Sequence, residues 1–568
     1  MKFSLISIIK YFQQKIKDRE NDKLLVIFLY VVAFFPIPFW SRWQIQLNSV
    51  SLGLYLITFI LLYTTISFRL LANENFNFKG IFAYILIIIL LCLICLTSYW
   101  EIYFQTSIDA DLFIYYIEHF SNLYSDSKEF FYDVYPGIWL HTICLFMSFV
   151  LSFLDARVNN VKRYLWLLPF LIAFYLSMQF DSTLNHKKII NNENLSRDKI
   201  TKVNSIPYHF DKPDVIIFLL EGVSDSYLDF PSENSKIDKR NIQKVENCFI
   251  PIPHSSKSIF TLLTGSIQLN TTRPKLNPQL IKNSLPKFFQ TLGYQTNFIF
   301  TQSFAFENID DIANNLFNKT IDSRALEAWS KNKSLTYQTF AWGIDDTILI
   351  DYVDEYLLNT QDPIFTLIGF SNTHSPYFIP STNPDHRKGK LNKLERYKSS
   401  IKRTETILVD LMNRFLQRRK KEPLFLILSD HGESFGERNF HNHNYSIYNQ
   451  ETKIPCIFIH SSFKNKLSIK SAGLKDIGTS IKNLISPNVA KSKLNIDIFS
   501  DQYLLKMPLK TWNSNNFIGL IEGDTKYILD KRRNQLFLMD LNEDNIKEQT
   551  SSKDFDLFYK KWNAYSEE

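Results

Sequence analysis

Two acidic residues and a histidine follow directly after long apolar runs in the second half of the chain. Residues 214–220 (DVIIFLL) have the pattern of a buried strand, and Glu221 comes immediately after them. Residues 423–429 (PLFLILS) form a second such run, followed by Asp430 and His431. Because ligands gather at the carboxyl ends of strands in open α/β sheets, we expect these side chains to converge at one sheet edge. Carboxylate and imidazole groups together suit Zn²⁺, with Mn²⁺ as the alternative.

A hydroxyl group that could act as a nucleophile is found between these two motifs. Residues 254–265 (HSSKSIFTLLTG) indicate a helix that begins near the serines and ends at Gly265. A hydroxyl at a helix N-terminus is well placed to attack phosphorus, because the backbone N–H groups and the helix dipole favour an anion there. The alternative is that Ser255 or Ser256 only caps the helix, a common role for serine. The local pattern by itself favours the cap.

The elements that must position these residues indicate a chain of two domains. At 568 residues, the chain is too long for one compact core. From residue 213 onward, strand-like apolar runs alternate with helical patterns, which favours a layered α/β domain over residues 213–568. Residues 181–212 are polar and rich in Asn and Lys, and we interpret them as a linker.

Residues 1–180 are predicted to form a transmembrane domain with five helices. A helix needs about 20 residues to span the ~30 Å hydrocarbon core, and the first and last of the five apolar segments are short by this measure. The segments cover residues 24–40, 50–71, 80–99, 137–154 and 164–180. Basic residues before residue 24 and in the loops at 69–79 and 157–163 should face the cytoplasm, and the acidic loop at 101–135 should lie outside. The N-terminus would then be cytoplasmic, and everything after residue 181 extracytoplasmic.

Charge and cysteine content narrow the functional classes. Much of the formal net charge of +7 comes from basic residues that precede the first apolar segment. No basic stripe or recognition motif accompanies it, so we do not expect nucleic-acid binding. Cys248 and Cys456 are the cysteines beyond residue 181. Their apolar surroundings favour buried thiols, with a disulfide as the alternative in an oxidising compartment.

Three motifs, taken together, resemble those of the alkaline phosphatase and sulfatase superfamily. Glu221 after its strand, the segment at 255–265 and residues 429–433 (SDHGE) occur in the order seen in sulfatases and lipid-headgroup transferases. Sulfatases read Cys-x-Pro-Ser-Arg-x-x-Leu-Leu-Thr-Gly, which places their modified cysteine on Ser255. Phosphoethanolamine transferases and lipoteichoic acid synthases carry threonine there, followed three residues later by serine, here Ser258. Both comparisons select Ser255 over Ser256.

The resemblance extends to further segments of the second half of the chain. Residues 372–377 (NTHSPY) resemble the family's His-x-Pro segment, which implies that His374 binds substrate. His443 resembles a second phosphate-contacting or metal-binding histidine, and His441 is the alternative for that role. Residues 342–346 (WGIDD) resemble a segment of the lipoteichoic acid synthase branch. Late in the chain, residues 526–544 resemble the terminal hairpin of sulfatases.

The resemblance implies an α/β sulfatase-like, three-layer domain with metal-dependent activity. The metal, Zn²⁺ or alternatively Mn²⁺, would be held by Glu221, Asp430, His431 and Ser255 itself. We expect Ser255 to attack a phospholipid donor such as phosphatidylethanolamine. The headgroup would then pass, through a phospho-serine intermediate, to a cell-envelope glycan or lipopolysaccharide acceptor. The chain would be a multi-pass protein of the bacterial inner membrane with a periplasmic catalytic domain.

Three other functions remain as alternatives. A phosphoglycerol transferase would use phosphatidylglycerol, and a membrane-bound phosphodiesterase or sulfatase would use water as the acceptor. The sulfatase signature needs Pro and Arg where this chain has Lys257 and Ile259, which disfavours conversion of Ser255 to formylglycine. The many disulfides common among phosphoethanolamine transferases are also absent. A catalytically inactive interaction domain is disfavoured by the intact set of candidate metal ligands.

Overall fold

The computed structural model describes residues 210–566, apart from 211, 232–236, 272, 307–308, 381–390, 465–467, 487–496, 513–515 and 532. These residues belong to one compact unit. The five predicted membrane segments, and residues 181–209 of the predicted linker, lie outside the described residues. Among the helices of the described ranges, none combines the length and the apolar character needed to cross a membrane.

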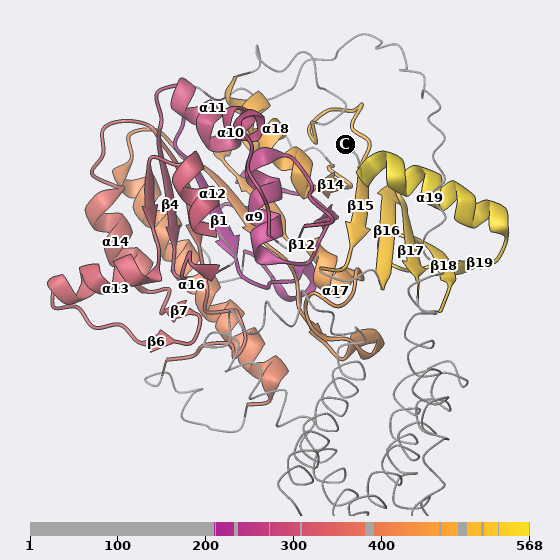
Figure 1. The fold of residues 1–568 in the computed structure, drawn as a ribbon. Coiled ribbons are helices and arrows are strands. Elements are labelled where there is room, and N and C mark those ends of the chain that lie inside the picture. The colour runs from indigo at the N-terminus through magenta and orange to yellow at the C-terminus, as the bar shows by residue number, and fades with distance from the viewer. Residues whose placement is uncertain are drawn as a thin grey trace, which may run out of the picture. The chain divides into compact units, whose positions relative to one another are not determined.

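A seven-stranded sheet forms the centre of the domain, and five neighbouring strands in it run parallel (Figure 1). In spatial order its strands are β2 (Ile242–Lys244), β13 (Cys456–Ile459), β9 (Leu424–Ser429), β1 (Val215–Leu220), β8 (Ile364–Gly369), β4 (Gln295–Phe300) and β5 (Lys319–Ile321). The predicted strands at 214–220 and 423–429 are thus neighbours, β1 and β9. Their unbroken apolar runs reflect a sheet covered on both faces.

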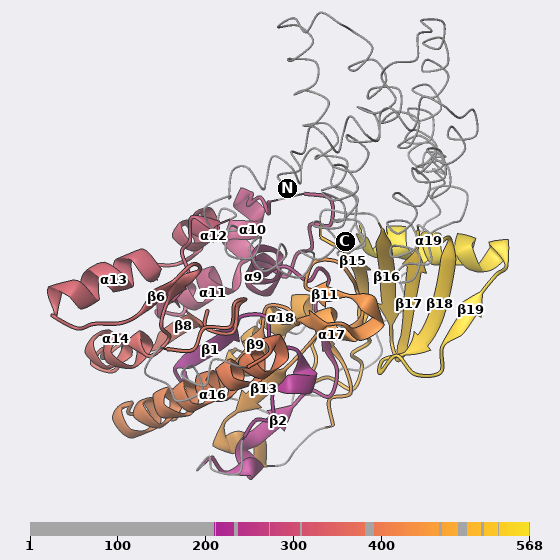
Figure 2. The ribbon, with the colours of Figure 1, turned by 90° about the horizontal axis from the view of Figure 1, so that it is seen from below.

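Helices cover both faces of this sheet, which confirms the expected layered α/β fold (Figures 1 and 2). One face packs against α9 (Ser255–Thr264), α10 (Pro278–Asn283), α11 (Leu285–Thr291), α12 (Ile309–Leu316) and α18 (Leu474–Ile485). The other packs against α13 (Ser323–Asn332), α14 (Ile348–Tyr356) and α16 (Lys393–Arg418). Successive residues of β1 alternate between the two hydrophobic cores, as the pleat of a strand requires.

A second sheet of five antiparallel strands follows in the chain (Figure 2). It consists of β15 (Lys506–Lys510), β16 (Phe517–Glu522), β17 (Thr525–Asp530), β18 (Gln535–Asp540) and β19 (Lys547–Gln549). One face packs against the final helix, α19 (Ser552–Ser566), through Phe558. The other contributes to a core that contains Phe249 and Phe440. Strands β17 and β18 form the hairpin that the sequence predicts.

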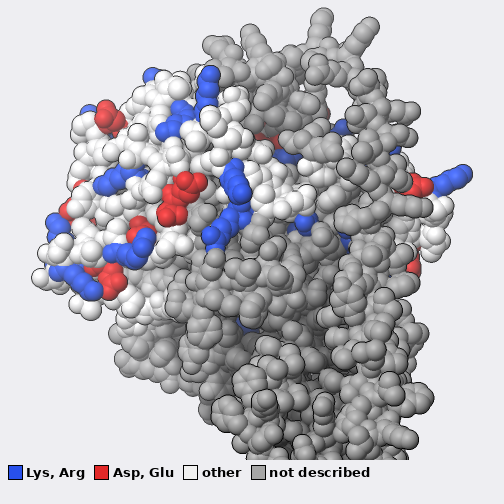
Figure 3. All heavy atoms as spheres, viewed as in Figure 1, with Lys and Arg blue, Asp and Glu red and all other residues white. Residues whose placement is uncertain are grey.

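Short elements complete the described fold. Three small sheets consist of β3 (Cys248–Phe249) with β12 (Lys453–Ile454) and β14 (Ala472–Gly473), β6 (Thr339–Phe340) with β7 (Gly343–Ile344), and β10 (Ser434–Phe435) with β11 (His441–Asn442). A single-turn helix, α17, covers Asn449–Thr452. Cys248 and Cys456 are buried free cysteines. On the described part of the face in Figure 3, basic and acidic side chains are interspersed.

A buried ion pair ties the start of β1 to the end of α16. Arg419 Nε lies 2.6 Å from Asp214 Oδ2, and Arg419 Nη2 lies 3.0 Å from Asp214 Oδ1. The two side chains are only 7% and 5% exposed. Asp214 Oδ1 also accepts a hydrogen bond from the backbone N–H of Ile364. One carboxylate therefore fixes the first residues of two neighbouring strands, β1 and β8.

Replacing Arg419 with methionine should lower the free energy of unfolding by about 3–5 kcal/mol, because it leaves the Asp214 carboxylate buried without its cation. Arg418→Met is the matched control, since the Arg418 side chain is 42% exposed. The control should cost less than about 1 kcal/mol. Denaturant unfolding followed by tryptophan fluorescence measures both. Equal losses in the two variants would contradict this account.

Candidate active site

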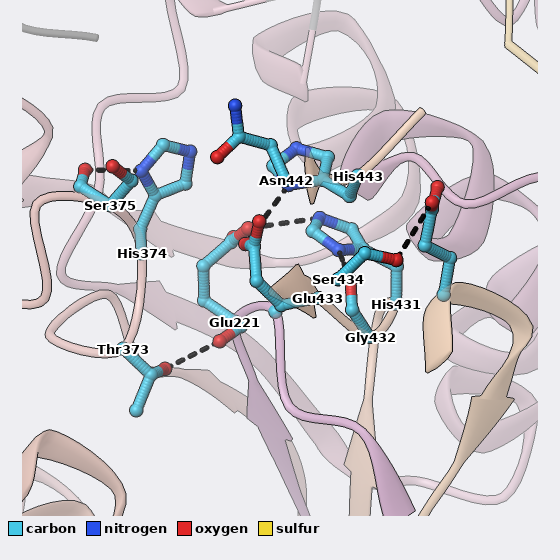
Figure 4. A network of polar contacts seen from close by, with 12 residues as sticks. Glu221, Thr373, His374, Ser375, His431, Gly432, Glu433, Ser434, Asn442 and His443 are labelled. Carbon is cyan, nitrogen blue, oxygen red and sulfur yellow. Dashed lines mark hydrogen bonds and ion pairs between the residues drawn. The ribbon is translucent and has the colours of Figure 1, made fainter. Parts of the chain in front are cut away.

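Three neighbouring parallel strands, β9, β1 and β8, deliver the candidate residues to one edge of the sheet. Glu221 follows β1, and Asp430 and His431 follow β9. Each of these three residues offers one ligand atom, and the three atoms lie within 4.8 Å of one another. His431 Nε2 is 3.2 Å from Glu221 Oε1 and 3.6 Å from Asp430 Oδ2. The structure therefore brings together the three candidate ligands that follow the strands, as Figure 4 shows for Glu221 and His431.

Ser255 joins this group from the first turn of α9. Its Oγ lies 3.2 Å from Glu221 Oε1 and 3.3 Å from His431 Nε2. The N-cap residue of α9 is His254, whose side chain makes no capping hydrogen bond. Ser256 Oγ instead lies 3.3 Å from His254 Nδ1. In this geometry the Ser255 hydroxyl faces the carboxylate and imidazole groups and is not the helix cap.

Backbone hydrogen bonds orient the ligand atoms of Asp430 and His431. Asp430 Oδ1 accepts hydrogen bonds from the N–H groups of Gly222 (2.9 Å) and His431 (2.7 Å), which leaves Oδ2 for the cluster. His431 Nδ1 lies 2.9 Å from the carbonyl oxygen of Gly432. Because a carbonyl can only accept, Nδ1 carries a proton, so the ring in its neutral form would present the lone pair of Nε2 to the cluster.

Two glycines allow the chain to bend this tightly around the cluster. Gly222 has a φ of 64°, in the left-handed region that favours glycine. A Cβ at Gly432 would lie 2.0 Å from the backbone oxygen of Gln450 and 2.5 Å from Ser224 Oγ. The motif that follows β9 therefore needs glycine between His431 and Glu433 on steric grounds.

The chemistry of the cluster fits a divalent cation. Glu221 Oε2 is buried and has no hydrogen-bond partner among the described residues. An unpaired buried carboxylate is costly, and a cation would remove that cost. Two carboxylates, one imidazole nitrogen and one hydroxyl form an oxygen-rich set that suits Zn²⁺ or Mn²⁺. Glu221, Ser255, Asp430 and His431 are the residues that would hold the ion.

Protons take the place of a cation when none is bound. Burial and the Asp430 charge raise the pKa of Glu221 to about 8. Burial by itself lowers the pKa of His431, but Asp430 and Glu221 more than offset this and raise it to about 10. The metal-free cluster therefore holds at least one proton at neutral pH. A cation must displace it, so metal affinity should fall as the pH is lowered.

Two further histidines lie beside the cluster, on the opposite side of Glu221 from the sheet (Figure 4). The ring centroids of His443 and His431 are 3.9 Å apart, and those of His443 and His374 are 5.9 Å apart. His374 Nδ1 lies 2.7 Å from the carbonyl oxygen of Ser375, so Nε2 again carries the lone pair. Burial lowers the pKa of His374 to about 4 and holds that of His443 well below its usual value. Both rings are therefore neutral at neutral pH.

Of the two histidines considered for the second position, His443 is the one that contacts the cluster. His441 belongs to the β10–β11 hairpin, where its ring packs next to Gly436. His443 Nδ1 lies 3.2 Å from Glu433 Oε2. Glu433 is 1% exposed, and its Oε1 has no hydrogen-bond partner among the described residues.

Glu433 and Trp342 lie in segments that resemble the family's motifs, but their sequence context predicts no role for either residue. The Trp342 ring is centred 4.3 Å from that of His374 and is 4% exposed. The signal for Glu433 was its place in the SDHGE run, directly after the predicted metal ligands. Nothing in the local pattern pairs it with a histidine ten residues later.

Comparison with family models finds a match for the larger part of the domain. Residues 213–488 match the family model described as sulfatase. This part of the chain is therefore similar to the sulfatase family. No curated protein matches the chain significantly.

Several solved structures are similar in fold at low sequence identity. A protein in the alkaline phosphatase superfamily from Vibrio parahaemolyticus is 14% identical, with a TM-score of 0.45, over 64% of this chain and 90% of its own. The lipoteichoic acid synthase LtaP from Listeria monocytogenes is 14% identical, with a TM-score of 0.47, over 63% and 90%. The C-terminal periplasmic domain of EcEptC from Escherichia coli is 16% identical, with a TM-score of 0.41, over 56% and 94%. That domain has also been solved in complex with Zn.

Proposed function

We propose that the domain is a metal-dependent phosphotransferase that moves a phospholipid headgroup to an acceptor in the cell envelope. The donor is phosphatidylethanolamine, and the acceptor is an envelope glycan or lipopolysaccharide. The observation that carries this proposal is the position of Ser255, at the N-terminus of α9 and beside both Glu221 and His431. The proposal includes the membrane domain predicted from residues 1–180, which places the catalytic domain in the periplasm next to its lipid donor.

The first half-reaction exchanges one phosphate ester for another. Glu221, Asp430 and His431 would hold a divalent cation, which would lower the pKa of the Ser255 hydroxyl and neutralise charge on the phosphoryl group. Ser255 Oγ forms a bond to phosphorus, and the bond from phosphorus to the diacylglycerol oxygen breaks. The N-terminal end of α9 carries partial positive charge, which favours the anionic phosphoryl oxygens. The proton lost by Ser255 balances the one gained by diacylglycerol.

The second half-reaction needs a base, and the two neutral histidines supply it. A hydroxyl of the acceptor loses its proton to His374 or His443 as its oxygen bonds to phosphorus. The Ser255–phosphorus bond breaks, and Ser255 recovers a proton. Glu433 accepts the Nδ1 proton of His443, which holds the ring in the tautomer whose Nε2 is basic. This is covalent catalysis in two displacements, for which ping-pong kinetics are expected.

The surroundings of Ser255 support a phosphotransferase over a sulfatase. Lys257 stands at the proline of the sulfatase signature, and its Nζ donates to Gln268 O (2.9 Å) and Thr271 Oγ1 (2.7 Å). Ile259 stands at the signature's arginine and is fully buried in the hydrophobic core. The residues that lead a sulfatase cysteine to formylglycine are therefore replaced by groups with structural roles.

A fluorescent-lipid assay tests the proposed donor. The full-length protein is incubated in detergent micelles with Zn²⁺ or Mn²⁺ and with acyl-labelled phosphatidylethanolamine or phosphatidylglycerol. Labelled diacylglycerol from phosphatidylethanolamine is the expected product. Its appearance from phosphatidylglycerol alone would replace the donor and indicate a phosphoglycerol transferase. Release from neither lipid by the metal-loaded protein would contradict a headgroup transferase.

Replacing Glu433 with glutamine should lower kcat by about 10- to 100-fold, the effect typical of a lost carboxylate partner of an active-site histidine. The substitution removes the charge that stabilises the protonated ring of His443 but keeps the shape of the side chain. Diacylglycerol release measures kcat. Glu437→Gln, in the same segment, is the control, because Glu437 contacts Tyr227 and Phe435 and not His443. Full activity of Glu433→Gln would show that His443 does not depend on this carboxylate.

A further inference from the structure

Asp346 is a fully buried carboxylate that the proposed mechanism does not use. Its Oδ1 accepts hydrogen bonds from Thr301 Oγ1 at 2.6 Å and from the Ser371 N–H at 2.9 Å. Its Oδ2 accepts from the Asn372 N–H at 3.1 Å. The N–H of Asp346 in turn donates to Asn372 Oδ1 at 3.2 Å. Asp346 therefore binds the backbone of the loop that follows β8, just before His374.

The neighbouring residue, Asp345, holds the same loop from a second direction. Asp345 forms an ion pair with Arg403 of α16 at 2.7 Å, and its Oδ1 accepts from Asn372 Nδ2 at 3.1 Å. The Arg403 and Asp345 side chains are 16% and 8% exposed. Asn372 is thus fixed through its backbone N–H and through both atoms of its amide. Since α16 is 26 residues long and packed in the core, it gives this network a rigid base.

The segment that carries these two carboxylates also packs against His374. Trp342, four residues before Asp346, has its ring 4.3 Å from that of His374. Gly343 lies so close to the residue that follows β4 that a Cβ there would be 2.0 Å from Thr301 O and 3.1 Å from Ser371 Oγ. The His374 N–H donates to Ser371 O at 3.0 Å. Residues 342–346 therefore contact the turn that contains His374, and Trp342 also packs against the His374 ring.

A purely structural role would not favour an ionised group at this position. Burying a carboxylate is costly, and a well-packed apolar side chain of similar size often stabilises a fold as well or better. Hydrogen bonds donated to a charged acceptor are, however, directional and roughly twice as strong as those between neutral groups. They fix the orientation of Ser371 and Asn372, and with it the position of the imidazole two residues later.

We propose that Asp346 is a positioning residue for His374, acting through the backbone of Ser371 and Asn372. The inference rests on the proposed function, because it takes His374 as a group that reacts with substrate. Asp346 itself touches no reacting atom. Its removal should therefore harm the reaction only to the extent that His374 contributes to it.

A double-mutant cycle tests this dependence. His374→Ala should lower kcat by about 10²-fold, the lower limit for general acid–base catalysis. Asp346→Asn should lower kcat by about 10-fold or more, with the KM for the donor lipid unchanged. If Asp346 acts through His374, the double variant should be no slower than His374→Ala alone. If the fold losses of kcat in the two single variants multiply in the double variant, the proposal is overturned. Asp351→Asn, a nearby exposed carboxylate on α14, should leave kcat unchanged.

Two further measurements keep the test decisive if activity or folding fails. The histidine ring signals of the ¹⁵N-labelled protein report on His374 without turnover, with His374→Ala providing the assignment. Asp346→Asn should shift the His374 signals and Asp351→Asn should not; unchanged His374 signals in Asp346→Asn would overturn the proposal even if no lipid is turned over. If Asp346→Asn does not fold, Thr301→Val removes the 2.6 Å hydrogen bond to Asp346, together with those from Thr301 Oγ1 to Ser371 Oγ and Gly369 O, and keeps the carboxylate. It should then show a smaller loss of kcat that is again absent in the His374→Ala background, and a multiplied loss would count against the proposal.

Discussion

Ser255→Ala is expected to lower the rate of diacylglycerol release by at least about 10³-fold, because it removes the atom that attacks phosphorus. The loss should appear in kcat, since Glu221, Asp430 and His431 remain to bind the metal and, through it, the phosphate. Metal content should therefore stay near that of the wild type, which inductively coupled plasma mass spectrometry of the purified protein measures.

Ser256→Ala is the matched control, since the Ser256 hydroxyl contacts His254 and not the cluster. It should keep most of the wild-type activity. An inactive Ser256→Ala together with an active Ser255→Ala would contradict the assignment of Ser255 as the nucleophile. Loss of metal in Ser255→Ala would instead make this hydroxyl chiefly a ligand.

Glu221→Gln is expected to weaken metal binding by about 10³-fold and to abolish turnover at micromolar metal, because an anionic ligand becomes a neutral one. The metal-free protein should lose no stability. The pKa of Glu221 is raised to about 8, so its ionised form is disfavoured in the fold. The stability that the protonated carboxyl group contributes is fully present below the pKa that Glu221 has in the unfolded chain. It is lost as the pH rises toward 8, its pKa in the fold. Glutamine mimics the protonated form at every pH.

Thermal unfolding in chelator, and metal titration, separate these two effects. In chelator at pH 8, Glu221→Gln should have a Tm equal to or above that of the wild type; with metal, only the wild type should gain stability. Glu246→Gln, at an exposed position, should behave as the wild type in both conditions. A variant that binds metal normally, or that unfolds at a clearly lower temperature in chelator, would contradict a ligand role for Glu221.

The strands that carry the cluster could be predicted from the sequence because their physical signal is local. Residues 214–220 and 423–429 are unbroken apolar runs, the mark of parallel strands covered on both faces. The rule that ligands gather at the carboxyl ends of such strands then places Glu221 and Asp430 together. Ser255 needed the resemblance to known families, since its local pattern also fits a helix cap.

Other parts of the site depend on contacts between distant loops, which no local pattern reports. Asp346 binds Ser371 and Asn372 across 25 and 26 residues of sequence, from a different strand–helix connection. The contact of Trp342 with His374 has the same origin. Of the five-stranded antiparallel sheet, the sequence predicts only the hairpin of β17 and β18. The predicted membrane helices concern residues outside the described part of the chain, and they stay a prediction.

The mass of the intact, metal-loaded protein after incubation with phosphatidylethanolamine in micelles tests whether Ser255 forms a covalent phospho-serine intermediate. We expect an adduct with the mass of phosphoethanolamine, mapped by peptide fragmentation to Ser255 and absent from Ser255→Ala and from chelator-treated protein. A phosphoglycerol adduct at Ser255, formed only with phosphatidylglycerol, would keep the nucleophile and change the donor. Diacylglycerol release with no adduct on Ser255, or with an adduct on another residue, would contradict the claim that this hydroxyl is the nucleophile.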